Sequence, residues 1–282
     1  LLSEFLGHYC LISSISLSPD NQLLAGVSYN GTAHLCYVQG NLLQTLPTQI
    51  SFPETLKFIP DGQLLAIAGA NGVIKLWNLQ GELVTELAEH RGSVYSLSFS
   101  PDGKLLASAS RDGTVITWDL ESKQAINQFQ DHIGEVYTVA FSPNGEWLAS
   151  GGQDSTIRRW RIEDNSTKSP LHIYQARVNS VTFSPDGKTI FSSDDRGSVR
   201  IWDFDSGELL ATWTAHQSNI DHISLNSKGN LLATTGQEGE IKIWRIDSFE
   251  QLIGQVCSLM QNYLQNNSTV AQSDRSLCND RF

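Results

Sequence analysis

Apolar residues in this chain recur in short runs that are separated by turn signals. Leu97 and Phe99 alternate with polar neighbours, and the same alternation returns along the chain. An alternation with a period of two predicts a β-strand with one inward face. After a turn at Pro101, the continuous run from Leu105 to Ala107 predicts a second strand that is buried on both faces.

Each second strand is followed by a further turn and two more predicted strands. Asp112-Gly113, like Asn30-Gly31 and Asn71-Gly72, suits a hairpin turn because both central residues of such a turn adopt positive φ. The turn leads into the run from Val115 to Trp118, and a weaker fourth strand follows, as at Leu83 to Leu87. Four short antiparallel strands therefore make up one unit.

This unit is repeated six times at nearly constant spacing. A turn residue is followed 17 residues later by a slot that holds Trp in five of the six cases, and successive units lie 41 or 42 residues apart. The turn residues are Pro19, Pro60, Pro101, Pro143, Pro185 and Ser227, and the slots are Cys36, Trp77, Trp118, Trp160, Trp202 and Trp244. Such a series predicts an all-β fold, a β-propeller with six four-stranded blades.

The slot residues also carry a family resemblance. Asp119 and Asp203 complete a Trp-Asp dipeptide, whereas Asn78, Arg161 and Arg245 take the place of that Asp. With these dipeptides and the repeat period, the chain resembles the WD-repeat propeller family over residues 1–247. The resemblance is specific for the fold and weak for the function, because propellers of this kind serve many unrelated roles.

The resemblance implies a buried hydrogen-bonded tetrad in each blade. In the family, the tetrad joins an anchor His eleven residues before the turn residue, a Ser or Thr of the second strand, the Asp of the next turn and the slot Trp. The matching residues are His90, Ser108, Asp112 and Trp118; His132, Ser150, Asp154 and Trp160; and His216, Thr234 and Trp244, with Glu238 in the place of Asp. The other repeats depart from the pattern at Tyr174 and Arg196, at Gln49 and Ile67, and at Gly26 and Cys36.

The repeats set the expected domain boundaries. We expect a propeller over residues 1–247, with repeats near 7–46, 48–88, 89–130, 131–174, 175–214 and 215–247. Residues 1–6 align with the fourth strand at Leu83 to Ala88, so they predict a closing strand, in which Ser3 to Leu6 pairs beside Ile241 to Arg245. The alternative is a ring cropped from seven blades, because seven is the commoner number in the family that the chain resembles. Since the chain starts inside a repeat, we expect it to be the carboxy-terminal piece of a longer protein.

The periodicity changes at the end of the chain, over residues 248–282. Phe249, Leu252 and Val256 recur at three- and four-residue intervals, which predicts a helix, and Ser248 with Gln251 forms a capping-box start. The alternative is that residues 251–255 form the missing fourth strand. The last segment, which includes Ser273 to Cys278, resembles the end of many large bacterial multidomain WD-repeat proteins, which often carry a signalling ATPase, protease or kinase module upstream.

Composition narrows the possible partners. The chain has 282 residues, of which 40% are hydrophobic and 17% charged, and its net charge is −11. An acidic chain repels phosphate backbones, so we expect no nucleic-acid partner. No stretch approaches 18 apolar residues, so we expect no membrane span. Four cysteines without a Cys-x-x-Cys pair predict neither a disulfide framework nor a zinc site, and we expect a cytoplasmic protein.

The sequence contains little evidence for a catalytic site. Four of the seven histidines, including His8, fall in the anchor column, and neither a His-Glu-x-x-His nor a Gly-x-Ser-x-Gly motif is present. We therefore expect no catalytic residue, no metal and no cofactor; a propeller hydrolase is a weaker alternative. Lys75, Arg158, Arg200 and Lys242 form a basic column two residues before the slot, which we interpret as solvent-facing strand residues.

The predicted function is that of a protein-interaction scaffold. In the propellers that this chain resembles, the third and fifth residues after the anchor and the residue before the tetrad Asp surround the central opening on one face. Tyr and Arg among them are typical interface anchors. The predicted partner-binding residues are Tyr95, Arg111, Glu135, Tyr137, Arg177, Asp195 and Asp221. The partner would be a protein or peptide; the alternative function is a sensor or autoinhibitory domain that holds an upstream module of the same chain.

Overall fold

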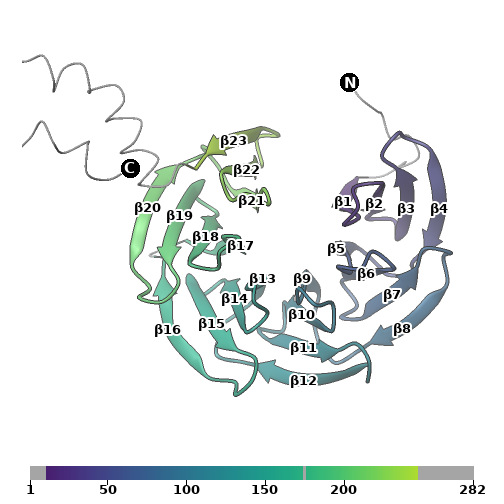
Figure 1. Cartoon of the computed structure of the whole chain (residues 1–282), viewed down its shortest axis with the longest axis horizontal. Coiled ribbons are helices and arrows are strands. Elements are labelled where there is room, and N and C mark those ends of the chain that lie inside the picture. Colours follow the sequence, from purple (N-terminus) through teal and green to yellow (C-terminus); the bar gives the residue numbers. More distant parts are fainter. Residues whose placement is uncertain (1–10, 174–175, 247–282) are drawn as a thin grey trace, which may run out of the picture.

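The computed structural model describes residues 11–173 and 176–246 of the chain. Its strands form consecutive antiparallel sheets, each connected in simple up-and-down order. Figure 1 shows these sheets as blades that follow one another around an arc, with the first strand of each blade innermost and the fourth outermost. The predicted all-β propeller is confirmed.

The strand bounds repeat closely from blade to blade. The first blade holds β1 (Ile12–Leu17), β2 (Leu23–Ser28), β3 (Thr32–Tyr37) and β4 (Leu42–Pro47). The second holds β5 (Pro53–Phe58), β6 (Leu64–Gly69), β7 (Ile74–Asn78) and β8 (Leu83–Leu87). The third holds β9 (Val94–Phe99), β10 (Leu105–Ser110), β11 (Val115–Asp119) and β12 (Gln124–Phe129). The fourth holds β13 (Val136–Phe141), β14 (Trp147–Gly152), β15 (Thr156–Arg161) and β16 (Thr167–His172).

The last two blades differ in strand number. The fifth holds β17 (Val178–Phe183), β18 (Thr189–Asp194), β19 (Ser198–Asp203) and β20 (Leu209–Thr214). Within the described ranges the sixth has three strands, β21 (Ile220–Leu225), β22 (Leu231–Gly236) and β23 (Ile241–Arg245). The predicted pairing of Ser3 to Leu6 with Ile241 to Arg245 and the predicted helix in 248–282 lie outside the described residues. Both stay predictions.

The turn between the first and second strands shows why the repeat begins with the same residues each time. Ser100 Oγ donates a hydrogen bond to Asp102 Oδ1 at 2.6 Å and accepts one from the Leu105 N–H at 2.9 Å. Gly103 has a φ of 71°, which a residue with a Cβ rarely adopts. The Ser-Pro-Asp-Gly sequence thus closes the turn with its own side chains, and this local closure aligns the second strand with the first.

The core lies between the blades. One cluster joins Ala66, Ile74 and Leu76 of the second blade to Val94 and Leu97 of the third, and all five are buried. Blades two to five therefore each pack one face against the preceding blade and the other against the following blade. This arrangement buries the second strands on both faces, as the continuous apolar runs predict.

Polar side chains also link the blades at the inner strands. Ser14 Oγ accepts a hydrogen bond from the Leu56 N–H at 3.1 Å, and Ser16 Oγ accepts one from the Phe58 N–H at 3.3 Å. The bond from the Val181 N–H to Thr138 Oγ1, at 3.1 Å, repeats this pattern between the fourth and fifth blades. Backbone donors on the inner edge of one blade are thereby satisfied by the preceding blade. In residues 11–173 and 176–246, no helix is long and apolar enough to cross a membrane.

Candidate functional site

Six of the predicted partner-binding residues lie at one end of the third, fourth and fifth blades. Tyr95 and Tyr137 lie near the starts of β9 and β13, and Arg111 follows β10 directly. The other three residues lie immediately beside the ends of strands in the fourth and fifth blades: Glu135, Arg177 and Asp195. The first strand of a blade begins at the edge where its second strand ends. Arg111 and Asp195, which follow second strands, therefore lie at the same edge as Tyr95 and Tyr137.

Glu135 connects the third blade to the fourth. The Tyr95 hydroxyl donates a hydrogen bond to Glu135 Oε2 at 3.1 Å, and Arg111 Nε lies 3.2 Å from Glu135 Oε1. The rings of Tyr95 and Tyr137 lie 5.5 Å apart between centroids, at an interplanar angle of 36°. One carboxylate therefore holds a tyrosine and an arginine of the neighbouring blade beside a second tyrosine.

The contacts continue into the fifth blade. The guanidinium carbon of Arg177 lies 5.3 Å from the Tyr137 ring centroid, within the range of a cation–π interaction. Arg177 Nε lies 3.6 Å from Asp195 Oδ2. We call the resulting chain of contacts the tyrosine patch; it consists of Tyr95, Arg111, Glu135, Tyr137, Arg177 and Asp195. Arg111 is exposed and the other five are half-buried, so the patch is accessible from outside.

Asp221 is placed differently from the other predicted residues. It lies on β21 and accepts a hydrogen bond from Asn219 Nδ2 at 2.7 Å. Asn219 in turn accepts a hydrogen bond from Asn179 Nδ2. These residues form a second polar group between the fifth and sixth blades, apart from the chain of contacts in the tyrosine patch.

The tyrosines of the patch are hydrogen-bond donors at neutral pH. Burial, together with the hydrogen bond to Glu135, raises the pKa of Tyr95 to about 12. Burial and the negative charge of Glu135 also raise the pKa of Tyr137. Both hydroxyls therefore stay protonated and can donate hydrogen bonds to carbonyl or carboxylate oxygens of a partner.

A shallow hollow adjoins the patch. It has a volume of about 490 Å³ and lies between the third and fourth blades, where Arg111 and Glu135 form part of its wall. Glu89, Arg91 and Gln130 complete much of the rest, so its lining is polar and of mixed charge. The hollow gives the patch a concave border that could receive polar groups of a bound chain.

Each turn that carries a patch residue is fixed by backbone bonding. The N–H of the residue before the tetrad position donates to the carbonyl oxygen of the third residue after the anchor. These pairs are Arg111 with Ser93 at 2.8 Å, Gln153 with Glu135 at 2.8 Å, Asp195 with Arg177 at 3.3 Å and Gln237 with Asn219 at 3.0 Å. The backbone of the site therefore has the same geometry in four neighbouring blades, whatever the side chain.

The tetrads lie directly beneath these turns. In the third blade, Trp118 Nε1 donates to Ser108 Oγ at 2.8 Å, His90 Nε2 lies 2.7 Å from the same hydroxyl, and His90 Nδ1 lies 2.9 Å from Asp112 Oδ2. The fourth blade repeats this arrangement; its residues are His132, Ser150, Asp154 and Trp160. Because the sequence neighbour of Asp112 is Arg111, a rigid tetrad holds a residue of the patch.

The tetrad carboxylates are stabilised in the ionised form. Burial would raise the pKa of Asp112, but hydrogen bonds from His90, Thr114 and the Arg91 N–H outweigh it and lower the pKa below its ordinary value. Asp154 shows the same balance, in which hydrogen bonds, led by the one from His132, outweigh burial.

These pKa shifts predict an acid-sensitive fold. Because the folded-state pKa lies below the unfolded one, the stabilisation is complete above about pH 5 and is lost as the pH falls toward the folded pKa. We expect the melting temperature to fall between about pH 5 and pH 2.5, and to fall less in an Asp112→Asn/Asp154→Asn double variant. Thermal denaturation followed by circular dichroism measures both curves. Parallel curves for the two proteins would contradict the role of these carboxylates.

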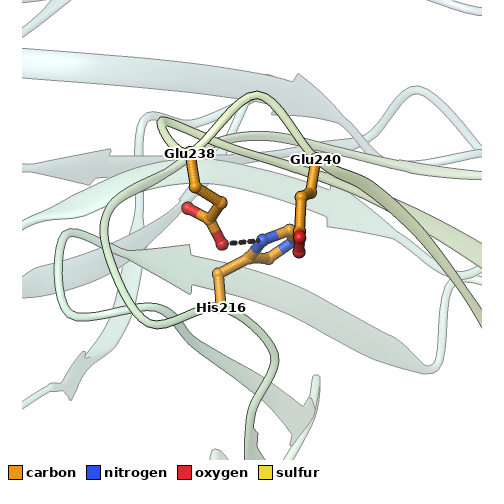
Figure 2. Close-up of side chains that lie close together, drawn as sticks. All are labelled: His216, Glu238 and Glu240. Carbon is orange, nitrogen blue, oxygen red and sulfur yellow. Dashed lines mark hydrogen bonds and ion pairs between the residues drawn. The ribbon is translucent and has the colours of Figure 1, made fainter.

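The sixth blade has a tetrad in which glutamate replaces aspartate. His216 Nδ1 lies 2.6 Å from Glu238 Oε1, His216 Nε2 lies 2.8 Å from Thr234 Oγ1, and Trp244 Nε1 donates to the same hydroxyl at 3.0 Å. Hydrogen bonding by Ser218 is the main reason that the pKa of Glu238 is lowered to about 2. Figure 2 shows Glu238 pointing at the ring nitrogen of His216.

The same region resembles a metal site at first sight. The ligand atoms of His216, Glu238 and Glu240 lie within 4.8 Å of one another (Figure 2). Both ring nitrogens of His216 already have protein partners, however, and Glu240 Oε2 lies 3.2 Å from Lys242 Nζ. We therefore interpret the cluster as the tetrad of the sixth blade.

The fifth blade contains a substitute for the tetrad that sequence reasoning missed. Trp202 Nε1 still donates to Ser192 Oγ at 2.9 Å. Asp194, which is fully buried, accepts hydrogen bonds from the N–H groups of Arg196 and Ser198 and pairs with Arg200. The signal was available: an acidic residue two positions before the tetrad column, with an arginine six residues later.

The interpretation of the basic column as solvent-facing was wrong. Lys75 is buried, with its Nζ 3.2 Å from Glu86 Oε1, and Arg200 pairs with Asp194. Lys242 Nζ donates to the Ala215 carbonyl oxygen at 3.0 Å. These three side chains are thus held against oxygen atoms of the protein and are largely shielded from solvent.

The second blade shows what a broken tetrad leaves behind. Ile67 stands where the third to sixth blades have Ser or Thr, and Trp77 Nε1 has no hydrogen-bond partner in this structure. His8, the anchor of the first repeat, lies outside the described residues. Tetrads are thus concentrated in the third, fourth and sixth blades, next to the tyrosine patch and at the end of the arc.

Comparisons with known proteins agree with the geometry. A family model described as the first β-propeller of IFT122 matches residues 54–203, which is more than half of the chain. The model of the WD domain, G-beta repeat, matches residues 1–36 and 207–245. No curated protein matches the chain. Together with the repeated four-stranded sheets, these matches show that the chain belongs to the WD-repeat β-propeller family.

Proposed function

We propose that this protein is a non-catalytic, cytoplasmic scaffold that binds a protein or peptide partner on the face that carries the tyrosine patch. The observation that carries the proposal is the continuous chain of contacts from Arg111 through Glu135, Tyr95 and Tyr137 to Arg177. It extends over three neighbouring blades, and side chains from separate blades thus make one surface.

The chemistry of the patch suits a polypeptide partner. Tyrosine and arginine are enriched among the residues that dominate interface energies, because each combines a large contact area with hydrogen bonding. Tyr95 and Tyr137 are held by neighbouring groups before any partner arrives, so little side-chain entropy remains to be lost on binding. The two arginines are balanced by Glu135 and Asp195, which favours a partner of mixed polarity over a strongly charged one.

A double substitution tests this surface. We expect the Tyr95→Ala/Tyr137→Ala variant to lose partners that the unmodified protein recovers from a cytoplasmic extract, with an affinity loss of at least about tenfold for a purified partner. The matched control is Tyr37→Ala, because Tyr37 is exposed and lies at the end of β3, away from the patch. Cooperative thermal unfolding of all proteins verifies that each is folded.

The outcomes separate the alternatives. Partners that are lost with the double variant and kept with Tyr37→Ala support the tyrosine patch as the binding face. Retention of every partner by a folded double variant would remove the patch from consideration. Equal losses with all variants would indicate that the recovered proteins bind exposed tyrosines without specificity.

A further inference from the structure

A second hollow lies between the first and second blades, at the same place in the repeat as the hollow beside the tyrosine patch. It has a volume of about 470 Å³, and Tyr29, Gly31 and Phe52 form part of its wall. Counted from the anchors, Tyr29 takes the position of Arg111, and Phe52 takes that of Glu135. Two aromatic rings therefore stand where the tyrosine patch has an ion pair.

The two rings are in contact and open to solvent. Their centroids lie 6.5 Å apart, at an interplanar angle of 55°. Phe52 is 61% exposed and Tyr29 is 40% exposed. Large aromatic side chains that remain exposed together have ring faces available to a ligand.

The backbone holds Phe52 in this exposed place. Its φ is 46°, and that of Gln49 is 53°, a region that residues with a side chain rarely adopt. The Ala70 N–H donates to the Phe52 carbonyl oxygen at 3.2 Å, and a Cβ on Gly69 would lie 2.4 Å from that oxygen. The end of β6 thus fits closely against Phe52. Backbone conformations of this kind are concentrated at binding sites, because they cost free energy that the fold alone does not recover.

A carboxylate without a counter-charge lies beside the rings. Glu54 is the second residue of β5 and is half-buried, and burial raises its pKa. Among the described residues, no basic side chain forms an ion pair with it. Burial, together with the negative charges of Glu54 and Asp221, raises the pKa of Tyr29. The rings therefore lie in an uncompensated negative field.

The tyrosine patch shows what is missing here. Its cation comes from the following blade, where the guanidinium carbon of Arg177 lies 5.3 Å from the Tyr137 ring centroid. In the first and second blades, Glu54 takes the repeat position of Tyr137, and Ser93 of the third blade takes that of Arg177. The following blade thus contributes a neutral side chain, and the aromatic and acidic groups remain without a cation.

From this arrangement we propose that Tyr29, Phe52 and Glu54 form a binding site for a cationic side chain, arginine or lysine, of a polypeptide. The ring faces attract the cation through their quadrupoles, and the carboxylate supplies the counter-charge. The net charge of −11 favours the approach of a basic segment. The site is separate from the tyrosine patch, and it does not depend on whether that patch binds a partner.

Small probes test the site without knowledge of a partner. The probes are the Nα-acetyl N-methylamides of arginine and lysine, and the neutral control is the same derivative of citrulline, which has nearly the shape of arginine. Nuclear magnetic resonance of the backbone amides follows the titration. We expect saturable changes in residues 29–32 and 49–54, with citrulline binding about fivefold or more weakly than arginine.

Three variants separate the contributions of the site. Phe52→Leu keeps an apolar side chain but removes the ring, and Glu54→Gln keeps the shape but removes the charge. We expect each to weaken binding of the arginine probe at least about threefold. Tyr37→Ala is the matched control, because Tyr37 is 42% exposed in the first blade but does not line the hollow. It should leave the affinity unchanged.

The outcomes decide between a cation site and its alternatives. Equal affinities for arginine and citrulline would show an apolar site without selection for charge. Unchanged affinity in both Phe52→Leu and Glu54→Gln, or shifts confined to the tyrosine patch, would place the probe elsewhere; each of these results overturns the proposal. If Phe52→Leu does not unfold cooperatively, Glu54→Gln decides alone. The Tyr95→Ala/Tyr137→Ala variant should still bind the arginine probe, so the two surfaces can fail separately.

Discussion

Replacing Arg200 by methionine is expected to lower the free energy of unfolding by about 3–5 kcal/mol, because it leaves the buried Asp194 carboxylate without its counter-charge. Asp194 has no exposed surface, and Arg200 is its cationic partner. The N–H groups of Arg196 and Ser198 remain as donors to the carboxylate, but they carry no charge to compensate it. Denaturant unfolding of the variant and the unmodified protein measures the difference.

A double variant separates the ion pair from simple loss of packing. Methionine keeps most of the apolar length of arginine, so the loss of contact area is small. In Asp194→Asn/Arg200→Met the charge is removed together with its partner, and we expect much of the lost stability to return. If the single and double variants unfold alike, the buried ion pair does not stabilise the fifth blade.

Replacing Asp154 by alanine is expected to lower the free energy of unfolding by about 1–3 kcal/mol, because it removes a largely buried carboxylate that accepts several hydrogen bonds. The carboxylate accepts hydrogen bonds from Thr156 Oγ1 at 2.8 Å and from the Ile133 N–H at 3.0 Å, and it lies 3.0 Å from His132 Nδ1. His132 would keep Ser150 as a partner on its other nitrogen but would lose the carboxylate on this one.

The matched control for Asp154→Ala is Arg196→Ala. Arg196 occupies the same repeat position in the fifth blade, but its side chain is exposed and the buried carboxylate there is Asp194. We expect this variant to stay within about 0.5 kcal/mol of the unmodified protein, as most exposed substitutions do. Equal shifts in melting temperature for Asp154→Ala and Arg196→Ala would contradict the assignment of the tetrads.

Much of the fold could be predicted from the sequence because its signals are local. The Ser-Pro-Asp-Gly turn closes through bonds within six residues, from Ser100 to Leu105, and the slot Trp recurs at a fixed distance from it. Even a weak fourth strand, at Leu83 to Leu87, has the predicted bounds. Turn chemistry and repeat length act on neighbouring residues, so they can be recognised without knowledge of the tertiary structure.

The interactions that the sequence did not reveal are those between different columns of the repeat. The pairing of Asp194 with Arg200 replaces the missing His and Asp of the fifth repeat from positions outside the tetrad columns. Likewise, the alignment of repeats placed Tyr95 and Glu135 on the same face but could not show that the Tyr95 hydroxyl donates a hydrogen bond to the Glu135 carboxylate. Such contacts depend on the distance between blades and on the side-chain rotamers, neither of which a linear pattern contains.

The repeated backbone bond before each tetrad position has a consequence for how new specificities could arise. Arg111, Gln153, Asp195 and Gln237 all hold their main chain by the same N–H donation, so this backbone bond does not depend on which side chain stands there. On the proposed binding face, a substitution at one of these four positions would change the side chain that is presented while the backbone bond remains. If the proposed face is the binding face, variants selected for new ligands should accumulate changes at these four positions first.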